Sequence, residues 1–163
     1  YKADIYEGGH RIPFLARWPG RINAGSSSGE TICLTDLLAT CAGVVGAPVP
    51  VNAGEDSYDI LPAMLGEPLS KPIREAIITQ AGNGAFMVRQ GRWKLELTPS
   101  SGGYYTLSDE QVRERGLPPI QLYDLEADIG ETSNVHDKHP DVVESLTALL
   151  ETYQQQGRSA PSY

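Results

Sequence analysis

The chain has 163 residues, a formal net charge of −8 and a hydrophobic share of 40%. This length suits one domain, or one domain with part of another, and no apolar run approaches the length of a membrane-spanning helix. The acidic balance argues against nucleic acid or an anionic membrane as the main partner. The charge is uneven, since residues 1–22 carry a net +2 and residues 100–163 a net −7. The one locally basic stretch, at the start of the chain, therefore suits a small anion.

The first twenty residues, YKADIYEGGHRIPFLARWPG, combine a polar turn with a short apolar run. Gly8 and Gly9 permit backbone angles that other residues resist, and they allow close approach to a ligand or another strand. The run from Phe14 to Trp18 lies between two prolines and predicts a buried strand. A polar turn at the mouth of such a strand is where α/β proteins commonly place chemistry. Spacing alone nevertheless favours a solvated surface role for Lys2.

An amphipathic helix is predicted from about Thr35 to Val45, with Thr35 as its cap. Asp36 is interpreted as an ordinary residue of the first helical turn rather than a catalytic carboxylate. A short helix, Ile60–Leu65, is predicted to start at Asp59 and to end at a glycine. The proline-containing stretch Glu67–Pro72 is typical of a linker. We therefore place a domain boundary there, which divides the chain into residues 1–70 and 71–163.

The two cysteines, Cys33 and Cys41, are eight residues apart. On one helix this separation corresponds to a rise of roughly 12 Å, which is too far for a disulfide. We interpret both as small buried apolar residues. They do not decide the redox compartment.

Beyond the linker the hydrophobic period changes to two. The predicted strands are Ala76–Gln80, Ala85–Arg89, Arg92–Leu97 and Gln121–Asp124. A tight hairpin turn at Gln90-Gly91 joins the second strand to the third. Along the third strand the side chains alternate between an apolar face and a charged face, which carries Arg92, Lys94 and Glu96. A helix that starts at Pro140 carries an apolar stripe and is expected to cover the apolar face of the sheet.

Two stretches have residue types that can bind metals. His136 and His139 are spaced so that they could share a helix face, but no other convincing ligand lies nearby and His139 is a candidate helix cap. The acidic stretch Asp124–Glu131 lacks the spacing of a calcium-binding loop. We rank a metal site in either stretch below a structural role.

Five blocks of the sequence, in a fixed order, resemble the sulfatase family, the arylsulfatase-like branch of the alkaline-phosphatase superfamily. The blocks are Lys2 with YEGGHRIPFLARWPGRI, LTDLLATCAG, SYDILPAMLGE, MVRQGRWKLEL and QLYDLEADIGETSNV. The resemblance is to the C-terminal portion of these enzymes. It implies an α/β fold, or α+β for this part in isolation. The expected architecture is the tail end of an alkaline-phosphatase-like α/β domain (1–70), followed by a small antiparallel sheet covered by a C-terminal helix (71–163).

The resemblance also implies a role for Lys2, because the family's sulfate-binding lysine stands five positions before the Glu-Gly-Gly sequence, with four residues between. Its ammonium would hold a sulfate oxygen and stabilise charge on the leaving oxygen. His10 is expected to contact the organic part of the ester or its bridging oxygen; the alternative is an exposed turn histidine.

Sulfatases use calcium and a formylglycine nucleophile made from a Cys/Ser-x-Pro-x-Arg motif, and we expect both in the parent protein. Neither Cys33 nor Cys41 lies in such a motif, and the family's metal ligands cannot be assigned here. This chain alone is therefore expected to bind no calcium and to be inactive. We expect a processed or truncated product, because the chain begins at Tyr1 rather than Met, and the absence of a visible signal peptide says little about location. The resemblance implies a periplasmic or secreted location.

Two other functions stay open: a phosphodiesterase or phosphonate hydrolase of the same superfamily, and a non-catalytic binding or assembly module. Neither nucleic acid nor a membrane is expected as a partner of the parent, whose substrate would be a sulfate ester. For the chain itself we expect self-association through the open strand Phe14–Trp18.

Overall fold

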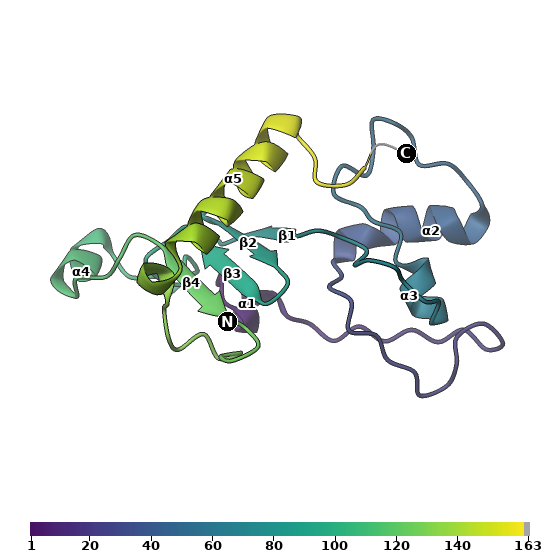
Figure 1. The fold of residues 1–163 in the computed structure, drawn as a ribbon, viewed down its shortest axis with the longest axis horizontal. Coiled ribbons are helices and arrows are strands. Elements are labelled where there is room, and N and C mark those ends of the chain that lie inside the picture. The colour runs from purple at the N-terminus through teal and green to yellow at the C-terminus, as the bar shows by residue number, and fades with distance from the viewer. Residues whose placement is uncertain (162–163) are drawn as a thin grey trace. The chain divides into compact units, whose positions relative to one another are not determined.

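The computed structural model describes residues 1–161, which form two compact units (Figure 1). Unit 1 comprises Tyr1–Ile12 and Ile78–Thr152, and unit 2 comprises Pro13–Ile77 and the residues from Tyr153 onward. The units do not follow the predicted division at residues 70 and 71, because Ile5 packs with core residues near the sheet. That division stays a prediction about the domains of the whole protein.

A four-stranded sheet forms the centre of unit 1, in the order β1-β2-β3-β4. Its strands are β1 (Ile77–Gln80), β2 (Phe86–Gln90), β3 (Trp93–Glu96) and β4 (Gln121–Asp124). β2 pairs antiparallel with β3, and β3 with β4. Gly91, between β2 and β3, has a φ of 57°, the positive angle that a tight hairpin turn needs. All four predicted strands are confirmed, with each boundary within one residue of its predicted position.

One face of the sheet is apolar. Val88 lies opposite Leu95, which lies opposite Leu122, and all three side chains are 0% exposed. The helix α5 (Pro140–Gln156) passes across the strands (Figure 1). Its most deeply buried side chains are Leu146 and Leu150. The predicted antiparallel sheet with a covering C-terminal helix is therefore confirmed.

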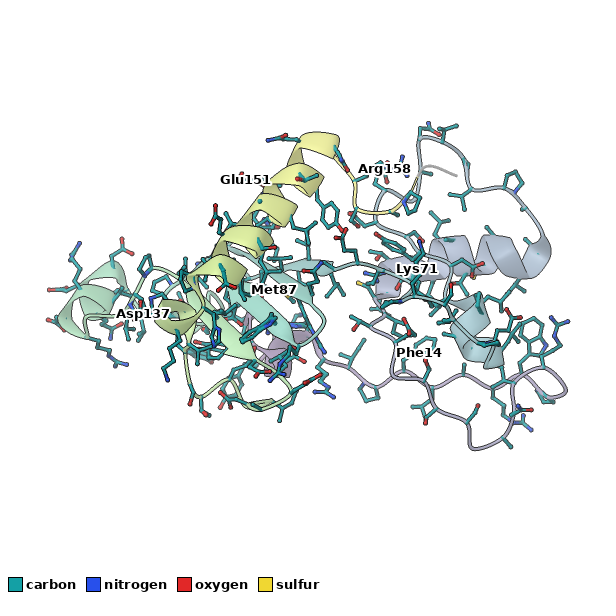
Figure 2. The ribbon with its side chains drawn as sticks, in the orientation of Figure 1. Phe14, Lys71, Met87, Asp137, Glu151 and Arg158 are labelled. Atoms are coloured by element: carbon teal, nitrogen blue, oxygen red, sulfur yellow. The ribbon has the colours of Figure 1, made fainter. Side chains whose placement is uncertain are left out.

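The other face of the sheet is charged and is buried as well. The register places Met87 opposite Glu96 and Arg89 opposite Lys94. Figure 2 labels Met87 within the sheet. Lys94 and Glu96 are both 0% exposed, although charged residues are rarely buried so completely unless they are paired. The short helix α1 (Glu7–His10) supplies one of their partners. This second cover comes from residues far away in the sequence, and strand periodicity does not predict it.

The remaining elements of unit 1 lie after β3. The helix α4 (Asp109–Glu114) begins with a capping box, in which Ser108 and Gln111 exchange hydrogen bonds of 3.0 and 3.2 Å. The 3₁₀ turn η2 (His136–Lys138) directly precedes α5.

Unit 2 contains the 3₁₀ turn η1 (Leu34–Asp36), the helix α2 (Leu37–Val45) and the helix α3 (Leu61–Leu65). Both predicted helices are confirmed, and each ends at a left-handed glycine, with a φ of 67° after α2 and 72° after α3. Asp59 Oδ1 accepts the backbone N–H of Leu61 at 2.8 Å, as predicted for the start of α3.

The predicted cap at Thr35 is wrong, because the side chain of Asp36, directly before α2, makes the hydrogen bonds at this helix start instead. Asp36 Oδ2 accepts the backbone N–H of Cys33 at 2.7 Å, and Oδ1 accepts that of Tyr58 at 3.1 Å. Asp36 also pairs with Arg74, and both side chains are buried. The guanidinium of Arg74 stacks 4.5 Å from the ring centroid of Tyr58. Asp36 therefore ties α2 to the segments around Tyr58 and Arg74 and has a structural role.

The strand predicted at Phe14–Trp18 is wrong. Within the described part of the chain, residues 11–18 form no regular secondary structure, and Figure 2 shows Phe14 on this irregular segment. Leu15 is 91% exposed and Phe14 is 42% exposed. An apolar run forms a strand only when a neighbouring strand pairs with it, and no described strand lies beside this one.

The cysteines are free thiols, Cys33 being half-buried and Cys41 exposed. The interpretation of Cys41 as buried is therefore wrong. None of the helices in residues 1–161 is long and apolar enough to cross a membrane.

Candidate functional site

The segment that carries Lys2 is held by backbone hydrogen bonds to two loops of unit 1, one between β1 and β2 and one after β3. The carbonyl of Ala3 accepts the N–H of Gly82 at 2.8 Å, and the N–H of Ile5 is donated to the carbonyl of Ser101 at 2.8 Å. Ala3 has a φ of 74°, which is uncommon for a residue with a side chain. Lys2 itself is exposed, and no hydrogen bond or ion pair joins it to the described residues. Its ammonium is therefore free to bind an anion.

The two glycines after Glu7 lie within α1 rather than in an open turn. Neither has a positive φ, so the conformational freedom expected of them is not what the structure uses. Close approach is what Gly9 provides: a Cβ there would lie 2.1 Å from the carbonyl oxygen of Asp4. A Cβ on Gly8 would meet nothing within 4 Å. Gly9 thus allows α1 to fold tightly against the Lys2 segment, whereas Gly8 is not required for it.

Glu7 is the residue that anchors α1. Its side chain is 8% exposed and its backbone N–H is donated to Glu131 Oε2 at 2.6 Å. Its carboxylate lies 3.4 Å from the Nζ of Lys94 and 3.7 Å from a guanidinium nitrogen of Arg89. The pKa of Glu7 falls to about 2, chiefly through its contact with His10 and also through Lys94 and Arg89, against the opposing effect of burial. Glu7 therefore stays ionised at neutral pH.

Lys94 stands at the centre of a buried group that we call the Lys94 cluster, formed by Glu7, Lys94, Glu96 and Glu131. The Nζ of Lys94 lies 2.5 Å from Glu131 Oε1, 3.2 Å from Glu96 Oε1 and 3.4 Å from Glu7 Oε1. An ammonium has three protons to donate, and here it faces three carboxyl groups. Burial of an unpaired charge costs several kcal/mol, so this set of partners is what permits a lysine inside the unit.

Glu96 differs from Glu7 in the direction of its pKa shift. Burial raises its pKa to about 8, although Lys94 acts in the opposite direction, and the nearby charge of Glu131 raises it further. Glu96 is therefore largely protonated at neutral pH. With Glu96 neutral, the ionised Glu7 still faces two cations, Lys94 at 3.4 Å and Arg89 at 3.7 Å.

An amide and two tyrosines extend the cluster along β4. The Nε2 of Gln121 donates hydrogen bonds to Glu96 Oε2 at 3.2 Å and to the Thr98 carbonyl at 2.9 Å. Its Oε1 accepts the hydroxyls of Tyr6 at 3.0 Å and Tyr123 at 2.7 Å. Burial raises the pKa of both tyrosines. Tyr6 directly precedes Glu7, so this network holds α1 from a second side.

His10 and Arg11 both point back to Glu7. The Nε2 of His10 lies 3.4 Å from Glu7 Oε1, and a guanidinium nitrogen of Arg11 lies 3.8 Å from Glu7 Oε2. His10 is 26% exposed and Arg11 is 62% exposed. The contact at Nε2 leaves Nδ1 of His10 for a ligand. His10 therefore contacts the Lys94 cluster through Glu7, whereas no hydrogen bond or ion pair joins Lys2 to the cluster in the described part of the chain. The roles of His10 and Lys2 as substrate contacts stay predictions.

The other candidates have contacts of a structural kind. His139 stacks on Trp93 with the ring centroids 4.7 Å apart, and the Nε2 of His136 lies 3.0 Å from Asp137. Asp128 accepts the backbone N–H groups of Thr132 at 2.7 Å and Ser133 at 2.8 Å. Within residues 1–161, no group of three or more His, Cys, Asp or Glu side chains is arranged to hold a metal ion.

Comparison with known proteins finds sulfatases that are similar to this chain over most of its length. An N-acetylgalactosamine-6-O-sulfatase of Bacteroides thetaiotaomicron is 34% identical over 93% of this chain, and human arylsulfatase A is 35% identical over 91% of it. Over nearly its whole length, the chain is similar to the C-terminal portion of sulfatases. It spans only 29% and 31% of the length of these two relatives, as expected for the C-terminal portion. No protein-family model matches the chain.

Solved structures agree with this assignment. A Bacteroides thetaiotaomicron sulfatase structure, described in connection with the metabolism of multiple glycosaminoglycans, matches with a TM-score of 0.78 and 33% identity over 94% of this chain. A second structure, solved with D-glucosamine-2-N,6-O-disulfate as its substrate, matches with a TM-score of 0.61 and 21% identity. At that identity the likeness shows the fold alone.

Sequence reasoning missed the roles of Lys94, Glu96 and Glu131. A signal was present, because Lys94 and Glu96 share one face of β3 with Met87, which is apolar, on the neighbouring strand. A charged pair beside an apolar residue on one face indicates a buried pair, but its partners cannot be found from the strand alone.

Proposed function

We propose that this chain is part of a longer polypeptide that hydrolyses sulfate esters, and that Lys2 and His10 line its ester-binding site. The similarity to named sulfatases over more than nine-tenths of the chain supports the reaction class. The position of Lys2, five residues before Glu7-Gly8-Gly9, supports the assignment of the lysine. The single observation that carries the proposal is the free, exposed ammonium of Lys2 on a segment that backbone hydrogen bonds fix to Gly82 and Ser101 in the loops beside the sheet.

The chemistry of the two side chains follows from their surroundings. The Lys2 ammonium binds a sulfate oxygen and stabilises the negative charge that develops on the bridging oxygen as the S–O bond breaks. His10, whose Nε2 faces the ionised Glu7, presents Nδ1 to the substrate; this atom accepts a hydrogen bond from a hydroxyl when His10 is neutral and donates one when it is protonated. Formylglycine, which the family resemblance implies, would supply the nucleophile from outside this chain, and calcium would stabilise the negative charge. The expected periplasmic or secreted location stays a prediction.

The test uses the complete polypeptide with three substrates: an aryl sulfate, an aryl phosphonate and N-acetylgalactosamine 6-sulfate. We expect turnover of a sulfate ester and a loss of at least roughly 100-fold in kcat/KM for Lys2→Ala, the size typical of removing one charge-stabilising donor. Lys71→Ala, which removes another exposed lysine (Figure 2), is the matched control and should leave kcat/KM unchanged. Turnover of the phosphonate alone, or equal kinetics for Lys2→Ala and Lys71→Ala, would overturn the proposal.

A further inference from the structure

Two members of the Lys94 cluster, Lys94 and Glu131, bind a third member, Glu7, at two points. The backbone N–H of Glu7 is donated to one oxygen of Glu131, and the other oxygen of Glu131 binds the Lys94 ammonium at 2.5 Å. Lys94 in turn reaches the Glu7 carboxylate at 3.4 Å. Lys94 and Glu131 together therefore grip both the main chain and the side chain of Glu7.

The conformation of Glu131 indicates that this grip is specific. Glu131 has a φ of 53°, a left-handed conformation that residues with side chains seldom adopt. Such a conformation persists only where the surroundings hold it in place. Here its carboxylate is 3% exposed and bonded to both Lys94 and the Glu7 backbone.

The position of the Glu7 carboxylate in turn affects that of the His10 side chain, which contacts it. The Nε2 of His10 and the Nζ of Lys94 lie at the same distance, 3.4 Å, from the same atom, Oε1 of Glu7. A shift of this oxygen therefore moves the preferred position of the imidazole. Arg11 contacts the other oxygen, Oε2, at 3.8 Å, so the carboxylate sets the direction of both side chains that follow the glycines.

We propose that Lys94 is a positioning residue of the sulfate-ester site: through Glu7, it fixes the orientation in which His10 meets the substrate. This inference rests on the proposed function above. The ammonium does not touch the substrate, since it is 0% exposed. Its effect on the reaction is the placement of His10, and misplacement of a substrate-contacting group by about 1 Å can lower a rate roughly 100-fold.

The kinetic test compares three variants of the complete polypeptide with the wild type. Lys94→Met and Glu7→Gln should each lower kcat/KM for a sulfate ester roughly 10- to 100-fold, mainly through a higher KM. Glu7→Gln keeps the volume of the side chain and leaves Lys94 paired with Glu96 and Glu131, so it gives a readout if Lys94→Met does not fold. Leu95→Ala is the matched control: it lies on the same strand, is equally buried and faces the opposite side of the sheet. It should lower the melting temperature and leave kcat/KM per folded molecule unchanged.

A double-mutant cycle separates positioning from general damage. If Lys94 acts through His10, adding Lys94→Met to His10→Ala should change kcat/KM by less than about 2-fold relative to His10→Ala alone. Full additivity of the two effects would overturn the proposal, and so would an equal rise in KM for Leu95→Ala.

An NMR measurement decides the positioning without any activity. In histidine-labelled protein, the His10 imidazole signal is identified by its loss in His10→Ala. We expect this signal to move in Lys94→Met and Glu7→Gln and to stay in place in Leu95→Ala. An unmoved signal in the first two variants would overturn the positioning role. If the wild-type polypeptide does not cleave sulfate esters, the proposed function fails, and the imidazole signal still decides whether Lys94 positions His10.

Discussion

At the scale of single residues, Glu7 and Glu96 face the same lysine, which lowers the pKa of both, yet their pKa values end up shifted in opposite directions. Glu7, at the edge of the Lys94 cluster, gains contacts with His10, Lys94 and Arg89 that outweigh its burial, and its pKa falls to about 2. Glu96, wholly buried on β3, has the desolvation of its charged form as the largest influence, and its pKa rises to about 8. The cluster thus holds one permanently ionised carboxylate and one that is largely protonated at neutral pH.

The raised pKa of Glu96 predicts a loss of stability with rising pH. Its pKa in the unfolded chain is near the ordinary value of 4.5, so between about pH 4.5 and 8 the folded state binds more protons than the unfolded state. The free energy of unfolding must then fall with pH across this interval and level off above it. For a fully buried group the total change is on the order of 3–5 kcal/mol.

Urea unfolding between pH 4 and 9 measures this dependence. Glu96→Gln, which is neutral at every pH, should lack the decline, and the difference between wild type and variant isolates Glu96 from other titrating groups. Parallel curves for the two proteins would contradict the protonation of Glu96.

At the scale of elements, α1 and the segment before it form one folded unit built on close backbone approach. The N–H of Gly9 is donated to the carbonyl of Tyr6 at 2.8 Å, and the N–H of Arg11 to that of Glu7 at 2.8 Å. Four residues of helix are too few to be stable alone. Their stability comes from the core contact of Ile5, from the hydrogen bond of Tyr6 to Gln121 and from the grip on Glu7.

The two glycines of α1 should therefore differ in their tolerance of substitution. Gly9→Ala places a Cβ 2.1 Å from the carbonyl oxygen of Asp4, so the backbone must move, and we expect a loss of about 2 kcal/mol. Gly8→Ala has free space around its Cβ and should change stability by less than about 0.5 kcal/mol. Chemical denaturation of the two variants measures this; equal losses would show that close packing at Gly9 is not what the sequence requires.

At the scale of the whole molecule, unit 2 has many apolar side chains on its surface. The largest exposed fractions are those of Leu15 (91%), Val45 (74%), Val51 (73%) and Leu34 (60%). Exposed apolar groups in such number are typical of a surface that another part of a protein covers. This fits a chain that spans about 30% of the length of its relatives.

We therefore still predict self-association of the isolated chain. Its cause would be these exposed apolar side chains, since the strand edge predicted at Phe14–Trp18 is absent. Size-exclusion chromatography with light scattering should give a mass above 17.6 kDa that rises with concentration. Leu15→Lys and Val45→Lys together should lower it, whereas Tyr104→Lys, at an exposed position of unit 1, should not. A monomer at every concentration would rule this out.

Much of the fold could be predicted from the sequence because its signals are local. Alternation along β3, the glycine at position 91 and the proline at the start of α5 each act within a few residues, and the elements form where these signals place them. The polar turn around Glu7 and its neighbours could also be singled out as a candidate site from residue types alone.

Tertiary structure alone decided which of these residues are buried and what they contact. The bond between Glu7 and Glu131 joins positions 124 residues apart, and that between Lys94 and Glu131 spans 37 residues. The apolar run Phe14–Trp18 shows the converse, since it has strand composition but no strand beside it in the described chain. Backbone propensity is a property of neighbouring residues, whereas the pairing of a buried charge or of a strand depends on groups that folding brings together from distant parts of the sequence.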